Sequence, residues 1–253
     1  MEEAETGSSA VELLCSLMSG AAVCGGQAAV DNSAACAQVP GAMLYRLGAR
    51  EAADRAVLEQ ALAVLERRLN GPDLCSLEAT VDPDGTMTLR VVSLAADGSF
   101  DAGLLEPGVF ELYAVDDTRS TTEIVPGYAV FPDLTGAPVM VKWEPLLPPG
   151  PVAAAEATST ATGWVVLVVL TEEARAAFAA ASAAHIGERL AITVDNVVLM
   201  APTVLEAVTG GELQINGNFT AEEAERLAAT LDAGSLPAGM TLELLSVETV
   251  DVR

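Results

Sequence analysis

The chain has 253 residues, of which 51% are hydrophobic. It can therefore bury one large or two smaller cores, and it is not a disordered chain. Its 36 acidic and 12 basic residues give a formal net charge of −24, which repels nucleic-acid phosphates and excludes a nucleic-acid partner. Its longest unbroken apolar run, residues 164–170, falls well short of the roughly 20 residues that span a bilayer.

Residues 1–40 read as an extension rich in Gly, Ala, Ser and Cys, in which a short helix over 9–19 is compatible with the sequence. The chain begins acidic rather than basic, so we expect no signal peptide. An even number of cysteines favours two disulfides in any of three pairings, and four reduced, buried thiols are the alternative. The absence of a C-x-x-C pair argues against a metal site. The candidate disulfide cysteines are Cys15, Cys24, Cys36 and Cys75.

Regular structure is predicted to begin with a strand over 42–47 and a helix over 50–69 that ends at Gly71 and Pro72. Two strands follow, 75–81 and 86–94, joined by a D-P-D-G turn. The order is thus β-α-β-β. One face of the helix is predicted to carry Val57, Ala61, Val64, Leu65 and Arg68, an apolar stripe with one arginine.

The middle of the chain, residues 95–162, is predicted to be loop-rich, with strands over 109–115 and 137–143. Residues 144–163 are rich in Pro and then in Ala, Thr and Ser. We interpret them as a mobile loop or hinge, with an ordered helix over 152–157 as the alternative.

Two similar blocks close the chain. In the first, a strand over 163–170 leads to a helix capped by Thr171 and then to a strand over 190–194. In the second, a strand over 212–215 leads to a helix and to a strand over 240–250. That helix begins at a T-x-x-E capping box and ends before a strand, with boundary residues Thr220, Glu223, Gly234 and Pro237. The pattern predicts an α+β, ferredoxin-like fold with helices on one face of antiparallel sheets.

No recognisable chemistry accompanies this scaffold. The sequence has no Gly-rich phosphate loop, no nucleophile elbow and no complete calcium loop. The single histidine, His185, falls at a helix end, where a structural role is expected. We therefore predict no catalytic, cofactor-binding or metal-binding residues, and we predict that the chain is not an enzyme. A hydrolase with an unrecognised carboxylate pair is a weaker hypothesis.

The C-terminal third resembles the first extracytoplasmic domain of SecD, the protein-export membrane subunit. The resemblance rests on the order and spacing of motifs over about 163–250, and it is weaker over 42–94, where "AVLEQALAVLERRLNG" (56–71) is similar to a family helix. It is absent over 1–40. The matching motifs are Leu190–Asp195, Met200–Pro202, Gly210–Gly211, Ile215–Ala224, Leu231–Pro237 and Val247–Val250.

The resemblance implies a base built from both ends of the domain and an inserted head that contacts unfolded preprotein and moves on the base. Carried over, residues 1–40 are an extension, 41–114 with 211–253 form the base, and 115–210 form the head. SecD spans the membrane and this sequence has no such span, so an excised ectodomain or a soluble relative is expected. The implied extracytoplasmic setting favours disulfides.

The expected function is to bind or guide unfolded polypeptide during export, in contact with the export machinery. The alternative is a structural or assembly protein that reuses the fold, self-associates and docks its N-terminal extension on a neighbouring subunit.

Overall fold

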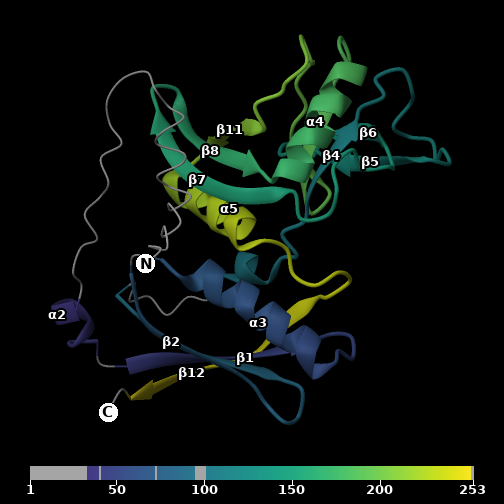
Figure 1. Cartoon of the computed structure of the whole chain (residues 1–253). Coiled ribbons are helices and arrows are strands. Elements are labelled where there is room, and N and C mark those ends of the chain that lie inside the picture. Colours follow the sequence, from purple (N-terminus) through teal and green to yellow (C-terminus); the bar gives the residue numbers. More distant parts are fainter. Residues whose placement is uncertain (1–32, 40, 72, 95–100, 252–253) are drawn as a thin grey trace, which may run out of the picture.

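A computed structural model describes residues 33–39, 41–71, 73–94 and 101–251 of the chain. The helix expected over 9–19 lies outside the described residues, as do Cys15 and Cys24. The fold is α+β with antiparallel sheets, as predicted, and it forms two units stacked one above the other in Figure 1. We call them the lower unit and the upper unit.

The lower unit is one four-stranded antiparallel sheet in the order β12-β1-β3-β2. Its elements follow the ferredoxin-like sequence β-α-β-β-α-β, in which the fourth strand returns beside the first. The upper unit is inserted between β3 and the last helix, α5. The strands are β1 (Gly41–Ala49), β2 (Leu74–Val81), β3 (Met87–Ser93) and β12 (Leu242–Asp251).

Helix α3 (Arg55–Leu69) covers one face of this sheet. Its buried residues recur at helical spacing: Leu58, Ala61, Leu62, Val64, Leu65 and Arg68. The helix starts later than predicted, because Asp54 has an extended backbone and the Arg50 amide donates to the Thr241 carbonyl at 3.0 Å. Arg50 therefore extends the backbone pairing of β1, and the residues between it and Asp54 do not join the helix.

A disulfide attaches the short helix α2 (Ser33–Cys36) to this unit. It joins Cys36 to Cys75 at the start of β2, with the two Cα atoms 5.5 Å apart. One disulfide of the expected kind is therefore present, and it fixes the segment before β1 to the edge of the sheet.

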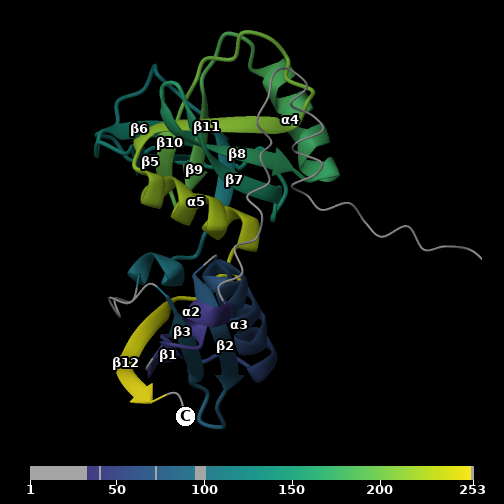
Figure 2. The same ribbon diagram turned by 90° about the vertical axis from the view of Figure 1, so that its left-hand side faces the viewer.

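The upper unit contains three small antiparallel sheets, in the orders β10-β9-β4, β11-β8-β7 and β5-β6. Helix α4 (Glu172–Ala184) packs on this unit, and α5 (Ala221–Ala233) lies against β7 and β8 on the side facing the lower unit (Figure 2). The strands are β4 (Phe110–Ala114), β5 (Tyr128–Pro132), β6 (Pro138–Lys142), β7 (Val152–Thr160), β8 (Gly163–Leu170), β9 (Leu190–Val194), β10 (Val197–Met200) and β11 (Glu212–Phe219).

The two units have separate hydrophobic cores. The main upper core joins β4, β8, β9, α4 and α5, and a smaller one surrounds Tyr113 and Phe131. The lower core joins α3 to its sheet and receives Ala233, Leu236 and Met240 from the end of α5 and the segment after it. The carboxyl end of α5 is thus the apolar contact that the units share.

The predicted loop over 144–163 is correct for 144–151, which form no helix or strand, but wrong for 152–160, and the helical alternative over 152–157 is also wrong. Residues 152–160 form β7, which pairs along its length with β8, and β5 also went unpredicted. Alanine and serine have low strand propensity, so the pattern of β7 is weak, and its position is set by pairing with the apolar β8.

The predicted limits of base and head do not follow this packing. Strands β4 and β11 were placed in the base, yet β4 pairs with β9 and β11 pairs with β8 in the upper unit. Helix α5 was expected to brace the base sheet, and most of it packs on β7 and β8 instead. The cause is that sequence order groups α5 with β12, whereas its apolar face fits the upper core.

Candidate functional site

The helix-boundary residues singled out in the sequence perform local structural tasks. The Thr171 hydroxyl accepts the Ala174 amide at 3.3 Å, and Thr220 and Glu223 form a reciprocal capping box. Hydrogen bonds from the Thr220 amide and hydroxyl to the Glu223 carboxylate lower the pKa of that carboxyl. Gly234 ends α5 at φ 81°, a left-handed conformation that favours glycine.

His185 stands at the carboxyl end of α4, where its Nδ1 lies 2.7 Å from Glu188 Oε2. That contact lowers the pKa of the Glu188 carboxyl. Within the described ranges, no group of three His, Cys, Asp or Glu side chains is placed to hold a metal ion.

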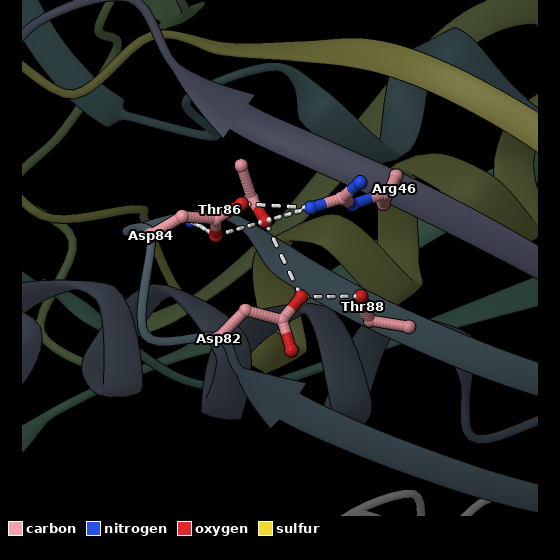
Figure 3. Close-up of polar contacts among 5 residues, drawn as sticks. All are labelled: Arg46, Asp82, Asp84, Thr86 and Thr88. Atoms are coloured by element: carbon pink, nitrogen blue, oxygen red, sulfur yellow. Dashed lines mark hydrogen bonds and ion pairs between the residues drawn. The ribbon is translucent and has the colours of Figure 1, made fainter.

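A polar cluster in the lower unit surrounds the predicted D-P-D-G turn between β2 and β3 (Figure 3). The Thr88 hydroxyl donates to Asp82 at 2.7 Å, the Thr86 hydroxyl donates to Asp84 at 2.7 Å, and Arg46 of β1 pairs with Asp84 at 2.8 Å. The bonds from Thr86 lower the pKa of the Asp84 carboxyl. Because each carboxylate already has partners within the turn, we assign the cluster to hairpin stability.

A cleft of about 960 Å³ lies on the upper unit where it faces the first connection from the lower unit. Its apolar lining includes Trp164, Phe219 and Leu227, and three of its ionic side chains already have partners. Arg226 contacts both oxygens of Asp101 at 3.1 Å, and Asp195 and Glu223 accept backbone amides. These polar groups hold the local fold, so we do not place the binding site there.

A second cleft, about 340 Å³, opens among α4, β9 and the segment 200–208. Its floor includes the buried side chains of Leu112, Phe178 and Ile192. Leu205 lines the cleft with 85% of its side chain exposed. Apolar side chains that line a solvent-accessible cleft are typical of a site that binds an apolar group. We refer to this feature as the apolar cleft.

Polar contacts hold the outer wall of the apolar cleft in place. The fully buried Ser182 of α4 accepts the Val208 amide at 2.9 Å. The backbone of Val204 pairs with Gly187 and Glu188, with N–O distances of 2.8 and 2.9 Å. The segment 200–208 is therefore fixed at both ends. Glu206 and Glu212 add carboxylates to the lining.

Sequence reasoning missed the apolar cleft. The signal available was Leu205 and Val208, two apolar residues in a segment with no helical or strand period. Their partners, Leu112 and Phe178, lie far away in sequence, so only the fold brings them together.

Comparison with known proteins shows which family this chain resembles. Residues 122–238 match the model of the SecDF P1 head subdomain. Over 86 residues the chain is 43% identical to the protein translocase subunit SecD of Acidaminococcus fermentans, covering 34% of this chain and 20% of that protein. The match to SecD of Acetobacter pasteurianus is longer, 26% identical over 212 residues, covering 79% of this chain and 40% of the relative. These matches relate the chain to the SecD periplasmic-domain family.

Solved structures support the same fold for this SecD relative. A structure described as a membrane component SecDF that enhances protein export has a TM-score of 0.60 and 24% identity, covering 81% of this chain and 99% of that one. SecDF in its Super-membrane-facing form has a TM-score of 0.67 and 23% identity, covering 83% of this chain and 30% of that one. The chain spans less than half of the length of the SecD proteins it matches. Among its described residues, no helix has the length and apolar character to cross a membrane.

Proposed function

We propose that this chain is a non-enzymatic, extracytoplasmic module that binds unfolded polypeptide during protein export. The observation that carries the proposal is the apolar cleft, which lies within the unit that the SecDF head model largely covers. In this proposal the upper unit acts as the head and the lower unit as the base. The relatives named as translocase subunits support a role in export.

The cleft suits an extended chain better than a folded surface. It is narrow enough to take one or two apolar side chains, which only an unfolded segment presents without other apolar neighbours. Glu206 and Glu212, together with the net charge of −24, would attract a segment that carries Lys or Arg beside its apolar residues.

The expected affinity is low. Burial of one Leu-sized side chain contributes about 1.5–3 kcal/mol, whereas a millimolar dissociation constant already requires about 4 kcal/mol. Rim charges add at most about 1 kcal/mol each, because solvent screens them. Weak and quickly reversible contact is what a module needs if it must release each segment as the chain moves on.

Location and chemistry agree with this assignment. An extracytoplasmic position follows the SecD relatives, and the Cys36–Cys75 disulfide is the kind of bond that persists outside the cytosol. We assign no catalytic step, because the His185 ring pairs with Glu188 and the carboxylates of the turns and caps accept local hydrogen bonds.

The test is a binding titration with a fluorescent, unstructured peptide that contains several Leu and Lys residues, followed by anisotropy at low salt. Leu205→Ser should weaken binding by about 5-fold or more, because it removes an apolar side chain from the cleft wall. Ile124→Ser is the matched control, since Ile124 is also fully exposed but does not line the cleft. Binding should fall as salt rises, since the Debye length shortens to about 8 Å at physiological ionic strength.

Two results would refute the proposal. One is the absence of detectable peptide binding to the unmodified chain. The other is equal weakening by Leu205→Ser and Ile124→Ser, which would show nonspecific adhesion to exposed apolar residues.

A further inference from the structure

Two chain segments connect the units, and they lie against each other. The first, residues 101–109, contains the short 3-10 helix η1 (Ala102–Leu105) and leads up into β4. The second, residues 234–241, leads down from α5 into β12. The Leu236 amide donates to the Pro107 carbonyl at 2.8 Å, so the two connections are joined where they cross.

Arg68, on α3 of the lower unit, binds both connections at once. Its Nη1 donates to the carbonyls of Leu104 and Glu106 at 2.7 and 2.6 Å. Its Nη2 donates to the carbonyls of Pro107 and Gly234 at 3.0 and 3.1 Å. The side chain is 5% exposed, although it is an arginine on the apolar face of a helix. A buried charge is costly unless it is hydrogen-bonded, and these four bonds engage both Nη atoms, whereas Nε has no hydrogen-bond partner among the described residues.

The upper unit holds the first connection from the opposite side. The Asp195 carboxylate, in the turn between β9 and β10, accepts the amides of Gly108 and Val109 at 2.9 and 2.8 Å. Residues 104–109 are thus held between a cation of the lower unit and an anion of the upper unit.

Gly108 makes this approach feasible. Its φ is +74°, and a Cβ atom built there would lie 2.4 Å from Arg68 Nη2 and 2.9 Å from Thr230 Cγ2. Any side chain at this position would push the guanidinium away from the connections.

We propose that Arg68 is a positioning residue that fixes the orientation of the upper unit on the lower unit. Within the described residues the two cores are separate, and the packing between the units is concentrated at α5 and the segment after it, which contact α3 and the lower core. The guanidinium restricts pivoting about this contact by holding three carbonyls of one connection and one carbonyl of the other. An ammonium cannot do the same, because it lacks the planar fork that spans them. The proposal concerns orientation and stands whether or not the apolar cleft binds polypeptide.

The test compares Arg68→Gln with Arg67→Gln in the full chain. Arg67 neighbours Arg68 on α3 but is exposed, so its loss changes the charge equally without touching the connections. Nitroxide labels on p-acetylphenylalanine at Gln60 and Glu173, one exposed site in each unit, report the distance between the units by pulsed electron resonance. We expect Arg68→Gln to widen the distance distribution at least 2-fold, Arg68→Lys to widen it less, and Arg67→Gln to leave it unchanged.

Tryptophan fluorescence, which reports on the upper unit, and circular dichroism, which also reports on the lower unit, together separate loss of orientation from loss of fold. The two tryptophans of the chain, Trp143 and Trp164, lie in the upper unit, and their emission should be the same in all variants. If Arg68→Gln does not fold, Gly108→Ala displaces the guanidinium from the other side and must widen the distribution by itself. An unchanged distribution in a folded Arg68→Gln, or in Gly108→Ala, overturns the proposal.

Discussion

In the lower unit, one helix covers one face of a single four-stranded sheet, whereas the upper unit spreads its strands over three small sheets with two helices. A continuous sheet covered by one helix forms one core that is not divided between separate sheets. Separate sheets leave gaps where they meet, and the cleft of about 960 Å³ and the apolar cleft both open in the upper unit. The lower unit has a cleft of about 350 Å³ as well, but that cleft lies between the residues after β1 and the segment before β12 and not between sheets.

Under the proposed function, this difference separates support by the lower unit from recognition by the upper unit. The lower unit carries a disulfide, a turn whose carboxylates are all bonded, and the arginine that holds the connections. The upper unit places Leu205 in water beside a cavity. Exposed apolar surface reduces solubility, so its retention in a fixed segment is consistent with a binding role.

The comparison between the units is tested most strongly by a destabilising substitution in one core while the unfolding of both units is measured. Leu47 is fully buried in the lower core, and Leu47→Ala should reduce the free energy of unfolding by about 2–5 kcal/mol. Because both tryptophans report on the upper unit, the denaturant midpoint seen by circular dichroism should fall while the fluorescence midpoint holds. Ile215→Ala, in the upper core, should move the fluorescence midpoint instead. Coincident shifts in both variants would show that the chain unfolds as one cooperative unit.

Loss of the disulfide should produce a smaller effect that is confined to the lower unit. Cys36 and Cys75 are 39 residues apart in sequence, and a crosslink that closes a loop of this size contributes about 2–4 kcal/mol. The double variant Cys36→Ser, Cys75→Ser should lower the circular dichroism midpoint and leave tryptophan emission unchanged. An equal loss in the fluorescence transition would mean that the N-terminal segment also supports the upper unit.

The elements that sequence reasoning found share strong local patterns. Helix α3 has a clear apolar face, α5 has a capping box and a terminal glycine, and the turn before β3 contains Pro and Gly. These signals act between residues at most a few positions apart, so the sequence displays them directly. Strand β7 was missed because its four alanines carry little strand signal of their own, and pairing with β8 decides its conformation.

The candidate site could not be predicted from the sequence for a related reason. Leu205 was visible as an apolar residue in a loop, but the cleft exists only because β4, α4 and β9 meet beside it. Arg68 was placed on the apolar face of its helix, which correctly indicated burial. Its four carbonyl partners, from Leu104 to Gly234, follow no sequence pattern, because backbone carbonyls are common to every residue.

The smallest expected effect concerns α5, the helix that both units contact. Thr220→Ala removes the N-cap hydroxyl and should cost about 1 kcal/mol, seen by circular dichroism and fluorescence together because α5 serves both cores. Thr171→Ala removes the cap of α4, which belongs to the upper unit alone, and should affect the fluorescence transition more.

The capping box also makes the stability of α5 depend on pH. The pKa of Glu223 is lowered in the folded chain because its carboxylate accepts the Thr220 amide and hydroxyl. The folded state therefore binds fewer protons than the unfolded state in this range, so the contribution is complete above the ordinary Glu pKa of about 4.3 and is lost as pH falls through the lowered value. Thr220→Ala should raise the Glu223 pKa, followed by NMR titration of its carboxyl carbon, and should flatten the acid limb of the stability curve. An unchanged Glu223 titration in Thr220→Ala would show that the hydroxyl does not hold the carboxylate and that the cap acts through the backbone alone.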